Sequence, residues 1–385
     1  MNLPGKESTP APATPLRPYH DRPTSWLGRL VTLVLIALLG LAAGELGVCY
    51  RDGGAFPHVN LYVADRELGV RLRPGATETI AVMGEPPTHL RINRDGYRGD
   101  ELPAPGADAV VVVGDAQVFG LGVEDRDAFA AVLGKTIGAP VVNAGVPTYG
   151  PLEYRQVIAE QLARRHPRTV VVAIDLLDDL LEAQQPTTAR AAVQDGWVVP
   201  RDAPPSALGD LPGHALLARR SHLLVAVRAW RHATAEPPGE RGAPTEASWS
   251  ALVAAGAQLQ QRPPGPTAAG DPPLGGWLRD IKQLTDAGGA RLVVVILPLD
   301  LQASPAAWKK YAAAPVDLEP SKAFTAALLE LCRAIGVSAL DATPVLATAG
   351  PGAFFDHSSY LTPAGHAAVA AALARTLAEP PPPRP

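Results

Sequence analysis

The side chains best suited to chemistry in this chain are two carboxylates and one imidazole, those of Asp115, Asp178 and His357. Asp115 follows the apolar run of residues 109–113, and Asp178 follows a second run at residues 169–174. A carboxylate close to an imidazole can act as a general acid and base, for example in cleaving an ester. Histidines and carboxylates form no cluster with metal-ligand spacing, so we expect no metal and no cofactor.

Short, unbroken runs of β-branched residues are typical of strands that are buried on both faces of a parallel sheet. Residues 109–150 read as strand, turn, helix and strand, and further strands are predicted at 169–174, 291–297 and 337–340. Helices are predicted between and after them, at 152–166, 278–287, 322–335 and 363–377, the last capped by Thr362. Ligand sites in such sheets lie at the carboxyl ends of the strands, where the three candidate side chains should meet.

Four short sequence stretches lie near the predicted strand ends or, in the last case, at the start of the last predicted helix. They are Gly114-Asp115-Ala116, then residues 143–150 (Asn-Ala-Gly-Val-Pro-Thr-Tyr-Gly), residues 167–178, and residues 354–366, which contain Leu-Thr-Pro-Ala-Gly-His. In order and pattern they resemble the four conserved blocks of the SGNH, or GDSL-like, hydrolases. The resemblance covers roughly residues 65–377 and implies a three-layer α/β/α, flavodoxin-like fold with a parallel sheet. It also implies ancestors that removed or transferred acyl groups, often acetyl groups on cell-surface polysaccharide.

The same resemblance implies where the catalytic groups of the family should lie. The serine position is Ala116, the oxyanion-glycine position Thr148, the asparagine position Leu177 and the histidine position Tyr360. Alanine has no side-chain oxygen and tyrosine has no imidazole, so no nucleophile–base pair remains at the expected place. The sequence thus predicts a pseudo-hydrolase that binds an acylated cell-envelope ligand or a partner protein. The predicted ligand-binding residues are Asp115, Ala116, Gln117, Thr148, Asp178, His357 and Tyr360.

Two other interpretations stay open. The chain could be an active esterase or O-acyltransferase in which Asp115, Asp178 and His357 replace the lost groups. It could also be a structural scaffold in an envelope assembly, with an arginine-rich helix predicted at residues 215–233 as one interface. Each candidate side chain also has a purely structural interpretation: Asp115 as a turn cap, Asp178 and its neighbour Asp179 as solvated carboxylates, and His357 as a loop residue.

The N-terminal part of the chain carries a long apolar segment. Residues 30–44 are apolar except for Thr32, and flanking residues extend the segment toward the length of a bilayer span. Arg17, Arg22 and Arg29 precede it, so the positive-inside rule places the N-terminus in the cytoplasm and the remaining chain outside. We therefore predict a single-pass anchor in the cytoplasmic membrane. A cleaved signal peptide is the alternative, since residues 42–44 are small.

Amino-acid composition and the positions of prolines and glycines divide the 385 residues into five parts. They are a disordered tail at 1–25, the membrane anchor at 26–50, a short β segment at 51–106, a hydrolase-like domain at 107–378 and a proline-rich tail at 379–385. Prolines and glycines cluster at the two ends of the chain and between about 185 and 275. The strand and helix pattern breaks at about 188–270, which predicts a helical insertion within the hydrolase-like domain. The formal charge of -4 without a basic stripe argues against a nucleic-acid partner.

Overall fold

The computed structural model describes residues 25–56, 60–81, 85–105, 109–176, 179, 191–205, 213–235, 273–310 and 317–382. The chain forms two compact units, residues 1–46 and 47–385. Most of the two predicted tails, together with Leu177, Asp178 and much of the predicted insertion, lies outside the described residues.

The described residues of the second unit are built around one five-stranded parallel sheet. Its strands are β5 (Val110–Gly114), β6 (Val141–Gly145), β7 (Thr169–Asp175), β10 (Arg291–Leu297) and β11 (Ser338–Asp341). They lie in the order β11-β10-β7-β5-β6, and every neighbouring pair is parallel. Numbered along the chain, this is the 2-1-3-4-5 order of flavodoxin-like folds, whose ligand crevice lies between the first and third strands. The predicted α/β architecture is therefore confirmed.

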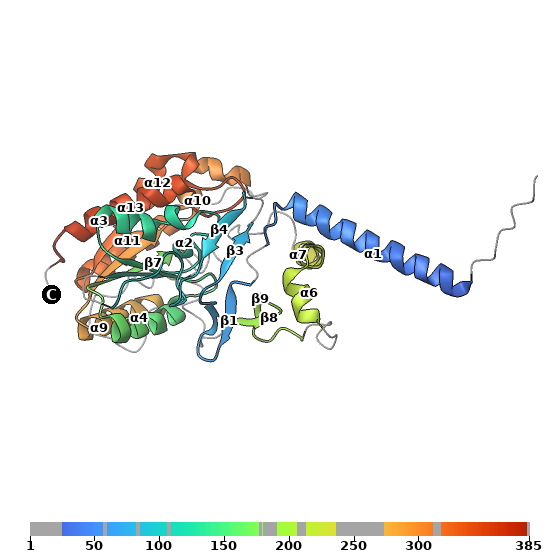
Figure 1. The fold of residues 1–385 in the computed structure, drawn as a ribbon. Helices are drawn as coiled ribbons and strands as arrows, with labels where there is room; N and C mark the ends of the chain where they lie inside the picture. Colours follow the sequence, from blue (N-terminus) through green and yellow to red (C-terminus); the bar gives the residue numbers. More distant parts are fainter. Residues whose placement is uncertain are drawn as a thin grey trace, which may run out of the picture. The chain divides into compact units, whose positions relative to one another are not determined.

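Helices cover both faces of the sheet (Figure 1). Their bounds are α2 Ala116–Phe119, α3 Phe129–Ile137, α4 Pro151–Arg165, α9 Pro273–Ala287, α10 Asp300–Ala303, α11 Glu319–Ala334, α12 Thr343–Ala349 and α13 Pro363–Ala378. Short 3-10 turns lie at Asp125–Asp127, Pro305–Lys310 and Pro351–Ala353.

Alternate side chains of a strand pack into two separate hydrophobic cores, one on each face of the sheet. In β5, Val111 and Val113 pack with residues of α4, α9 and α11, whereas Val110 and Val112 pack with residues of α3, α12 and α13. Successive side chains of a strand point to opposite faces, so a run of valines serves both layers. This is why the strands read as unbroken apolar runs, and it confirms the three-layer prediction.

The predicted bounds of the regular elements hold closely where the local signals are strong. The strand at Arg291–Leu297 has the predicted bounds, and Thr362 caps α13 by accepting a hydrogen bond from the Gly365 amide at 3.2 Å. The helix predicted from residue 278 begins five residues earlier, at Pro273, which occupies its first turn. The two glycines at 275 and 276 conceal this first turn from a sequence pattern, because glycine disfavours helix interiors.

Four short strands before the sheet form two antiparallel pairs. They are β1 (Tyr62–Asp65) with β2 (Gly69–Leu72), and β3 (Thr77–Ile80) with β4 (Thr88–Arg91). Arg71 ties this segment to α4, since its guanidinium binds Asp65 at 2.5 Å and Glu160 at 2.6 Å. The Tyr149 hydroxyl adds a hydrogen bond of 2.6 Å to the Val70 carbonyl. The segment is therefore part of the same folded unit as the sheet.

The described part of the insertion contains a hairpin and two helices. The hairpin is β8 (Ala191–Gln194) with β9 (Trp197–Pro200), and the helices are α6 (His214–Arg220) and α7 (His222–Ala235). The prediction of one continuous helix over 215–233 is wrong. Ser221 has an extended backbone, and its hydroxyl accepts a hydrogen bond of 3.1 Å from the Leu224 amide, so it ends one helix and starts the next.

The helix α1 (Trp26–Arg51) makes up most of the described part of the first unit, and its last five residues belong to the second. Its 26 residues carry no buried side chain, and at about 1.5 Å per residue it exceeds the roughly 30 Å of a hydrocarbon core. By length and composition α1 can cross a membrane, and a signal sequence would meet the same criteria.

Candidate functional site

The carboxyl ends of β5 and β6 meet under a short helix. Gly114 pairs with Gly145 at these ends, and α2 crosses directly above both. A Cβ atom on Gly145 would lie 2.3 Å from the Phe119 amide nitrogen, and one on Gly114 would lie 2.2 Å from a methyl of Val118. Only glycine admits this approach. The two glycines thus place Asp115 and Ala116 at the edge of the sheet where ligands bind in this class of fold.

Asp115 acts as the cap of α2. Its carboxylate accepts a hydrogen bond of 2.9 Å from the Gln117 amide, which satisfies a donor that the helix start leaves open. Ala116 follows with a relative exposure of 9% and presents only a methyl group. The structure therefore supports the structural interpretation of Asp115, and position 116 offers no side-chain nucleophile.

Gln117 joins the first block to the fourth, 242 residues later. Its amide nitrogen donates to the Ser359 carbonyl at 2.9 Å, and its amide oxygen accepts from the Leu361 amide at 3.2 Å. The side chain is buried, with a relative exposure of 4%. Both polar ends of Gln117 are thus engaged with the backbone on either side of Tyr360. We assign Gln117 a role in positioning Tyr360 rather than in touching a ligand.

Replacing Gln117 with leucine is expected to loosen residues 355–361. Two hydrogen bonds are lost and two buried backbone groups are left without these partners, at a cost of about 1–3 kcal/mol each. Hydrogen exchange at the Leu361 amide should accelerate by at least tenfold, as measured by mass spectrometry. In the matched variant Gln117→Glu the acceptor for Leu361 is kept, so its amide should stay slower than in Gln117→Leu. Equal exchange in all three proteins would contradict the positioning role.

Thr148 lies in the loop between β6 and α4 with an exposed side chain and a backbone φ of 91°. Positive φ is a genuine outlier for a β-branched residue, and glycine is the residue that adopts it without strain. The conformation fits a position where the resemblance implies glycine. The resemblance in sequence predicted that threonine replaces glycine here, whereas the strained backbone is visible only in the structure.

Three tyrosines gather beside this loop. Burial raises the pKa of Tyr62 well above its usual value, and the neighbouring Tyr360 and Tyr149 raise it further. Tyr62 and Tyr149 are buried, and Tyr360 is half-buried against the same core. The residue at the predicted histidine position therefore contributes a phenol packed among aromatic and apolar groups. A phenol has no imidazole nitrogen to accept a proton from a nucleophile.

His357 lies apart from this arrangement. Its side chain is exposed, and its backbone amide donates to Glu85 at 3.4 Å. In the described part of the chain, the imidazole makes no hydrogen bond or ion pair, so none joins it to Asp115. Leu177 and Asp178 lie outside the described residues. The prediction that the neighbouring Asp179 is solvated is wrong. Asp179 is buried, and its carboxylate accepts a hydrogen bond of 2.8 Å from the Asp175 amide.

A second polar cluster lies after β10 and was missed from the sequence. The buried carboxylate of Asp300 binds the ammonium of Lys310 at 3.0 Å, and Lys310 also donates to the Ser358 carbonyl at 3.1 Å. The ammonium lies 5.8 Å from the centre of the Phe354 ring. This pair thus holds Ser358, the residue before the Ser359 that Gln117 binds. One signal in the sequence could have revealed this cluster. Asp300 lies three residues beyond a buried strand, at the carboxyl edge of the sheet where ligand sites occur.

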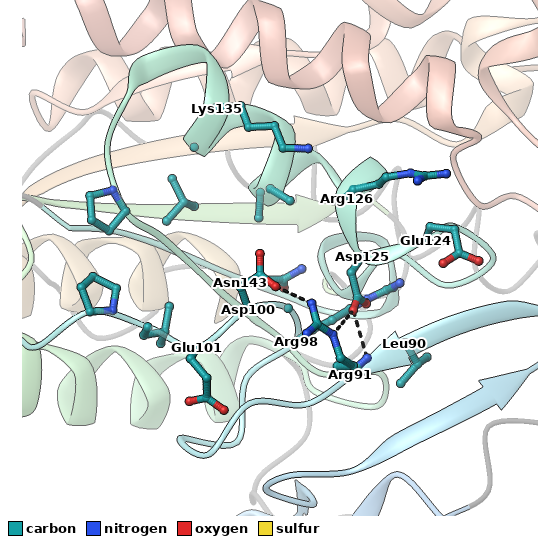
Figure 2. A pocket seen from close by; sticks show the side chains of 18 of the residues that line it. Leu90, Arg91, Arg98, Asp100, Glu101, Glu124, Asp125, Arg126, Lys135 and Asn143 are labelled. Atoms are coloured by element: carbon teal, nitrogen blue, oxygen red, sulfur yellow. Dashed lines mark hydrogen bonds and ion pairs between the residues drawn. The ribbon is translucent and has the colours of Figure 1, made fainter.

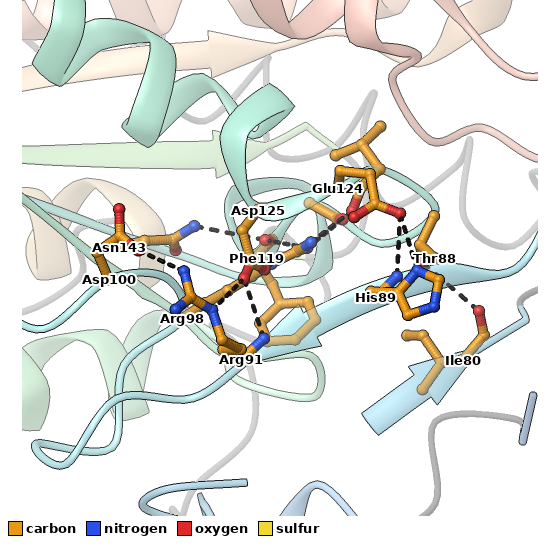
Figure 3. A network of polar contacts seen from close by, with 12 residues as sticks. Ile80, Thr88, His89, Arg91, Arg98, Asp100, Phe119, Glu124, Asp125 and Asn143 are labelled. Carbon is orange, nitrogen blue, oxygen red and sulfur yellow. Dashed lines mark hydrogen bonds and ion pairs between the residues drawn. The ribbon is translucent and has the colours of Figure 1, made fainter. Parts of the chain in front are cut away.

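An open pocket of about 690 Å³ lies elsewhere, between β4, α3 and the start of β6, and contains none of the predicted site residues (Figure 2). One of its lining residues, Arg98, connects neighbouring segments of the chain. The buried guanidinium of Arg98 binds Asp125 at 2.9 Å and the Phe119 carbonyl at 2.9 Å, and also the carbonyls of Gly120 and Val123 (Figure 3). Since this cation is fully engaged inside the protein, the pocket gives no reason to move the candidate site.

The fourth block ends at His366, which the sequence assigns to packing or capping on the final helix. The structure places it in α13 with 1% exposure, where its Nδ1 accepts a hydrogen bond of 3.2 Å from the Phe129 amide. Its ring stacks on Phe129 at a centroid distance of 5.9 Å. His366 thus joins α13 to α3 and is not available to the candidate site.

Comparisons with known proteins give structural likenesses only. No protein-family model matches the chain, and no curated protein matches it. Similar solved structures include TesA (14% identity, TM-score 0.38, 70% of this chain and 98% of that chain). They also include the lipase/acylhydrolase from Enterococcus faecalis (10%, 0.36, 72% and 100%) and a GDSL-like lipase from Bacteroides thetaiotaomicron (10%, 0.35, 70% and 88%). At TM-scores this low, the fold is defined by the strand order and register given above.

Proposed function

We propose that this protein is a membrane-anchored, SGNH hydrolase-like binding protein that holds an acylated cell-envelope ligand, or a partner protein, without hydrolysing it. The observation that carries the proposal is Ala116 at the end of β5. A methyl group occupies the place from which the resemblance implies attack by a serine oxygen. The adjacent Asp115 and Gln117 side chains are engaged with backbone groups, so neither is poised as a substitute nucleophile.

The same geometry favours binding at this edge. Gln117 and Lys310 hold the loop of residues 355–361 over the carboxyl end of the sheet, and Thr148 keeps a strained backbone beside it. Strained backbone that persists in a folded protein is found most often at ligand sites. The resemblance supplies the ligand class, an acyl group such as the acetyl ester of a cell-surface polysaccharide.

Membrane attachment and sidedness belong to the proposal. The apolar helix α1 is the anchor, and no Asp, Glu, Lys or Arg interrupts it between Arg29 and Glu45. Arg17, Arg22 and Arg29 hold its N-terminal side in the cytoplasm, because positive charge is retained there. The folded unit then faces the extracytoplasmic side, where acylated polysaccharides are found.

We expect the unaltered full-length protein, in detergent, to hydrolyse acetyl esters of varied size no faster than its His357→Ala variant. Each lacks a serine and an adjacent base, and loss of such groups lowers turnover by about 10³-fold or more. The double variant Ala116→Ser, Tyr360→His is the matched comparison, and any turnover that it gains shows that the missing groups limit the parent. Turnover by the unaltered protein that disappears in His357→Ala would instead establish a relocated active site.

Binding is tested separately, with acetylated xylan and the same xylan after chemical deacetylation as probes in calorimetric titrations. The proposal expects heat from the acetylated form, and a weaker response when Tyr360 is replaced by alanine. Equal binding of both forms would remove the acyl group from the proposal. No binding of either form, together with partner capture that tolerates Tyr360→Ala, would favour the scaffold alternative.

A further inference from the structure

The helices α6 and α7 carry a group of large apolar side chains on the outside of the folded unit. Leu216, Leu217, Val227 and Trp230 have relative exposures of 68%, 57%, 46% and 66%. Leu223, Val227 and Trp230 have the 4 and 3 spacing of one helical stripe, so the exposed residues of α7 share a face. We call these four exposed residues the α6–α7 face. Single exposed apolar residues are common, but several together on adjacent helices mark an interaction surface.

The opposite side of these helices attaches them to the protein. Val225 is buried against Phe56 and Trp197, and the His222 ring stacks on Phe56 with centroids 4.1 Å apart. The Asn60 side chain donates to the Arg219 carbonyl at 2.8 Å. The attachment therefore uses the inner side of α7 and leaves the α6–α7 face without a role in packing the described residues.

The charge on these helices has one sign. Between His214 and Ala235 the chain has four arginines, three histidines and no acidic residue. Arg228 is held against the protein by Asp195 at 3.7 Å and by the ring of Trp197, whereas Arg220 remains half exposed beside Glu78. A helix with Trp and Leu on one side and arginines among its polar residues is the type that lies in the interface of a bilayer with anionic lipids. Tryptophan in particular prefers the level of the headgroups.

Chain length places this surface near the membrane. The apolar helix α1 ends at Arg51, and Phe56 follows five residues later, which is at most about 18 Å of extended chain. Because Phe56 stacks on His222, the first residue of α7 lies within about 30 Å of the end of α1, counting both side chains. Trp230 lies eight residues further along α7, roughly 12 Å away. The short tether therefore limits how far the α6–α7 face can lie from the C-terminal end of α1.

We propose that the α6–α7 face rests in the headgroup region of the bilayer that α1 crosses, with the half-exposed Arg220, four residues after Leu216 on α6, meeting anionic lipid. The proposal rests on the membrane attachment proposed above for α1 and adds a second contact made by the folded unit itself. One occupant is specified, a lipid surface, because the apolar stripe, the positive charge and the short tether all favour it.

The test uses the full-length protein in nanodiscs of phosphatidylcholine and phosphatidylglycerol, with and without bromine atoms near the glycerol end of the acyl chains. Bromine quenches tryptophan fluorescence only on contact. Trp26 of α1 and Trp230 are the tryptophans of the described residues expected at the lipid. The quenched emission should therefore fall by roughly half in Trp230→Phe, and by less in nanodiscs that lack phosphatidylglycerol. The matched control is Trp308→Phe, which should leave the quenched emission unchanged.

The outcomes separate this inference from the proposed anchor. If the protein does not float with vesicles, and Trp26→Phe does not change the quenching, the anchor itself is wrong. If the protein floats and Trp26→Phe lowers the quenching while Trp230→Phe does not, the proposed lipid contact is overturned. A partner protein is then the alternative occupant of the α6–α7 face. Since Trp230 is exposed and phenylalanine is also apolar and aromatic, this variant should fold like the parent.

Discussion

Replacing Gly145 with alanine is expected to destabilise the protein by about 3 kcal/mol or more and to lower its Tm by at least about 5 °C. The added Cβ would lie 2.3 Å from the Phe119 amide nitrogen and 2.7 Å from the Val118 carbonyl carbon, both of them backbone atoms of α2. Neither can move aside without displacing that helix or breaking the hydrogen bond of 3.1 Å from the Gly145 amide to Asn143. Circular dichroism during heating of the full-length protein measures the effect.

Gly352 provides the control for this substitution. A Cβ there would meet nothing within 4 Å, and the residue does not have a positive φ. Gly352→Ala should leave Tm within about 1 °C of the parent, because an alanine that fits its backbone also limits the unfolded chain. If the two variants melted at the same temperature, α2 would not pack on the ends of β5 and β6 as described.

The order of the sheet and its two helical layers could be predicted because its signals are local. Runs of β-branched residues mark strands buried on both faces, and Thr362 followed by Pro363 marks the start of a helix. Local signals fail where two local preferences compete. Residues 215–233 have an apolar pattern throughout, yet Ser221 caps a second helix and divides them.

The candidate site was only partly predictable, since its geometry depends on contacts between distant residues. The turn at Asp115 and the positions of Thr148 and Tyr360 follow from the resemblance in sequence. No local pattern reveals that Gln117 holds the backbone on both sides of Tyr360, or that Asp300 and Lys310 fix the same loop. Such hydrogen bonds depend on the packing of α2 and α10 at one edge of the sheet, which a sequence does not display.

The stability of the protein should fall as the pH is lowered from about 6.5 toward 3 because of His366. Burial lowers the pKa of His366 to about 3, and the positive charge of Arg98 contributes to the same shift. In the unfolded chain the imidazole takes up a proton near pH 6.5, whereas in the folded protein it stays neutral to about pH 3. The unfolded state thus binds more protons within this window, so acid favours unfolding by up to about 1.4 kcal/mol per pH unit. Above about pH 6.5 the contribution of His366 is constant.

The variant His366→Gln separates this effect from that of the carboxylates, which titrate in both proteins. A glutamine oxygen can accept the hydrogen bond from the Phe129 amide but takes up no proton. Between about pH 7.5 and pH 4.5 the parent should lose about 2–3 kcal/mol more unfolding free energy than the variant, as measured by urea denaturation. Nitrogen NMR of the parent gives a second measurement, in which Nδ1 of His366 stays unprotonated down to about pH 4. Equal pH dependence in both proteins, with protonation of Nδ1 near pH 6, would show that His366 is not buried as the acceptor that joins α13 to α3.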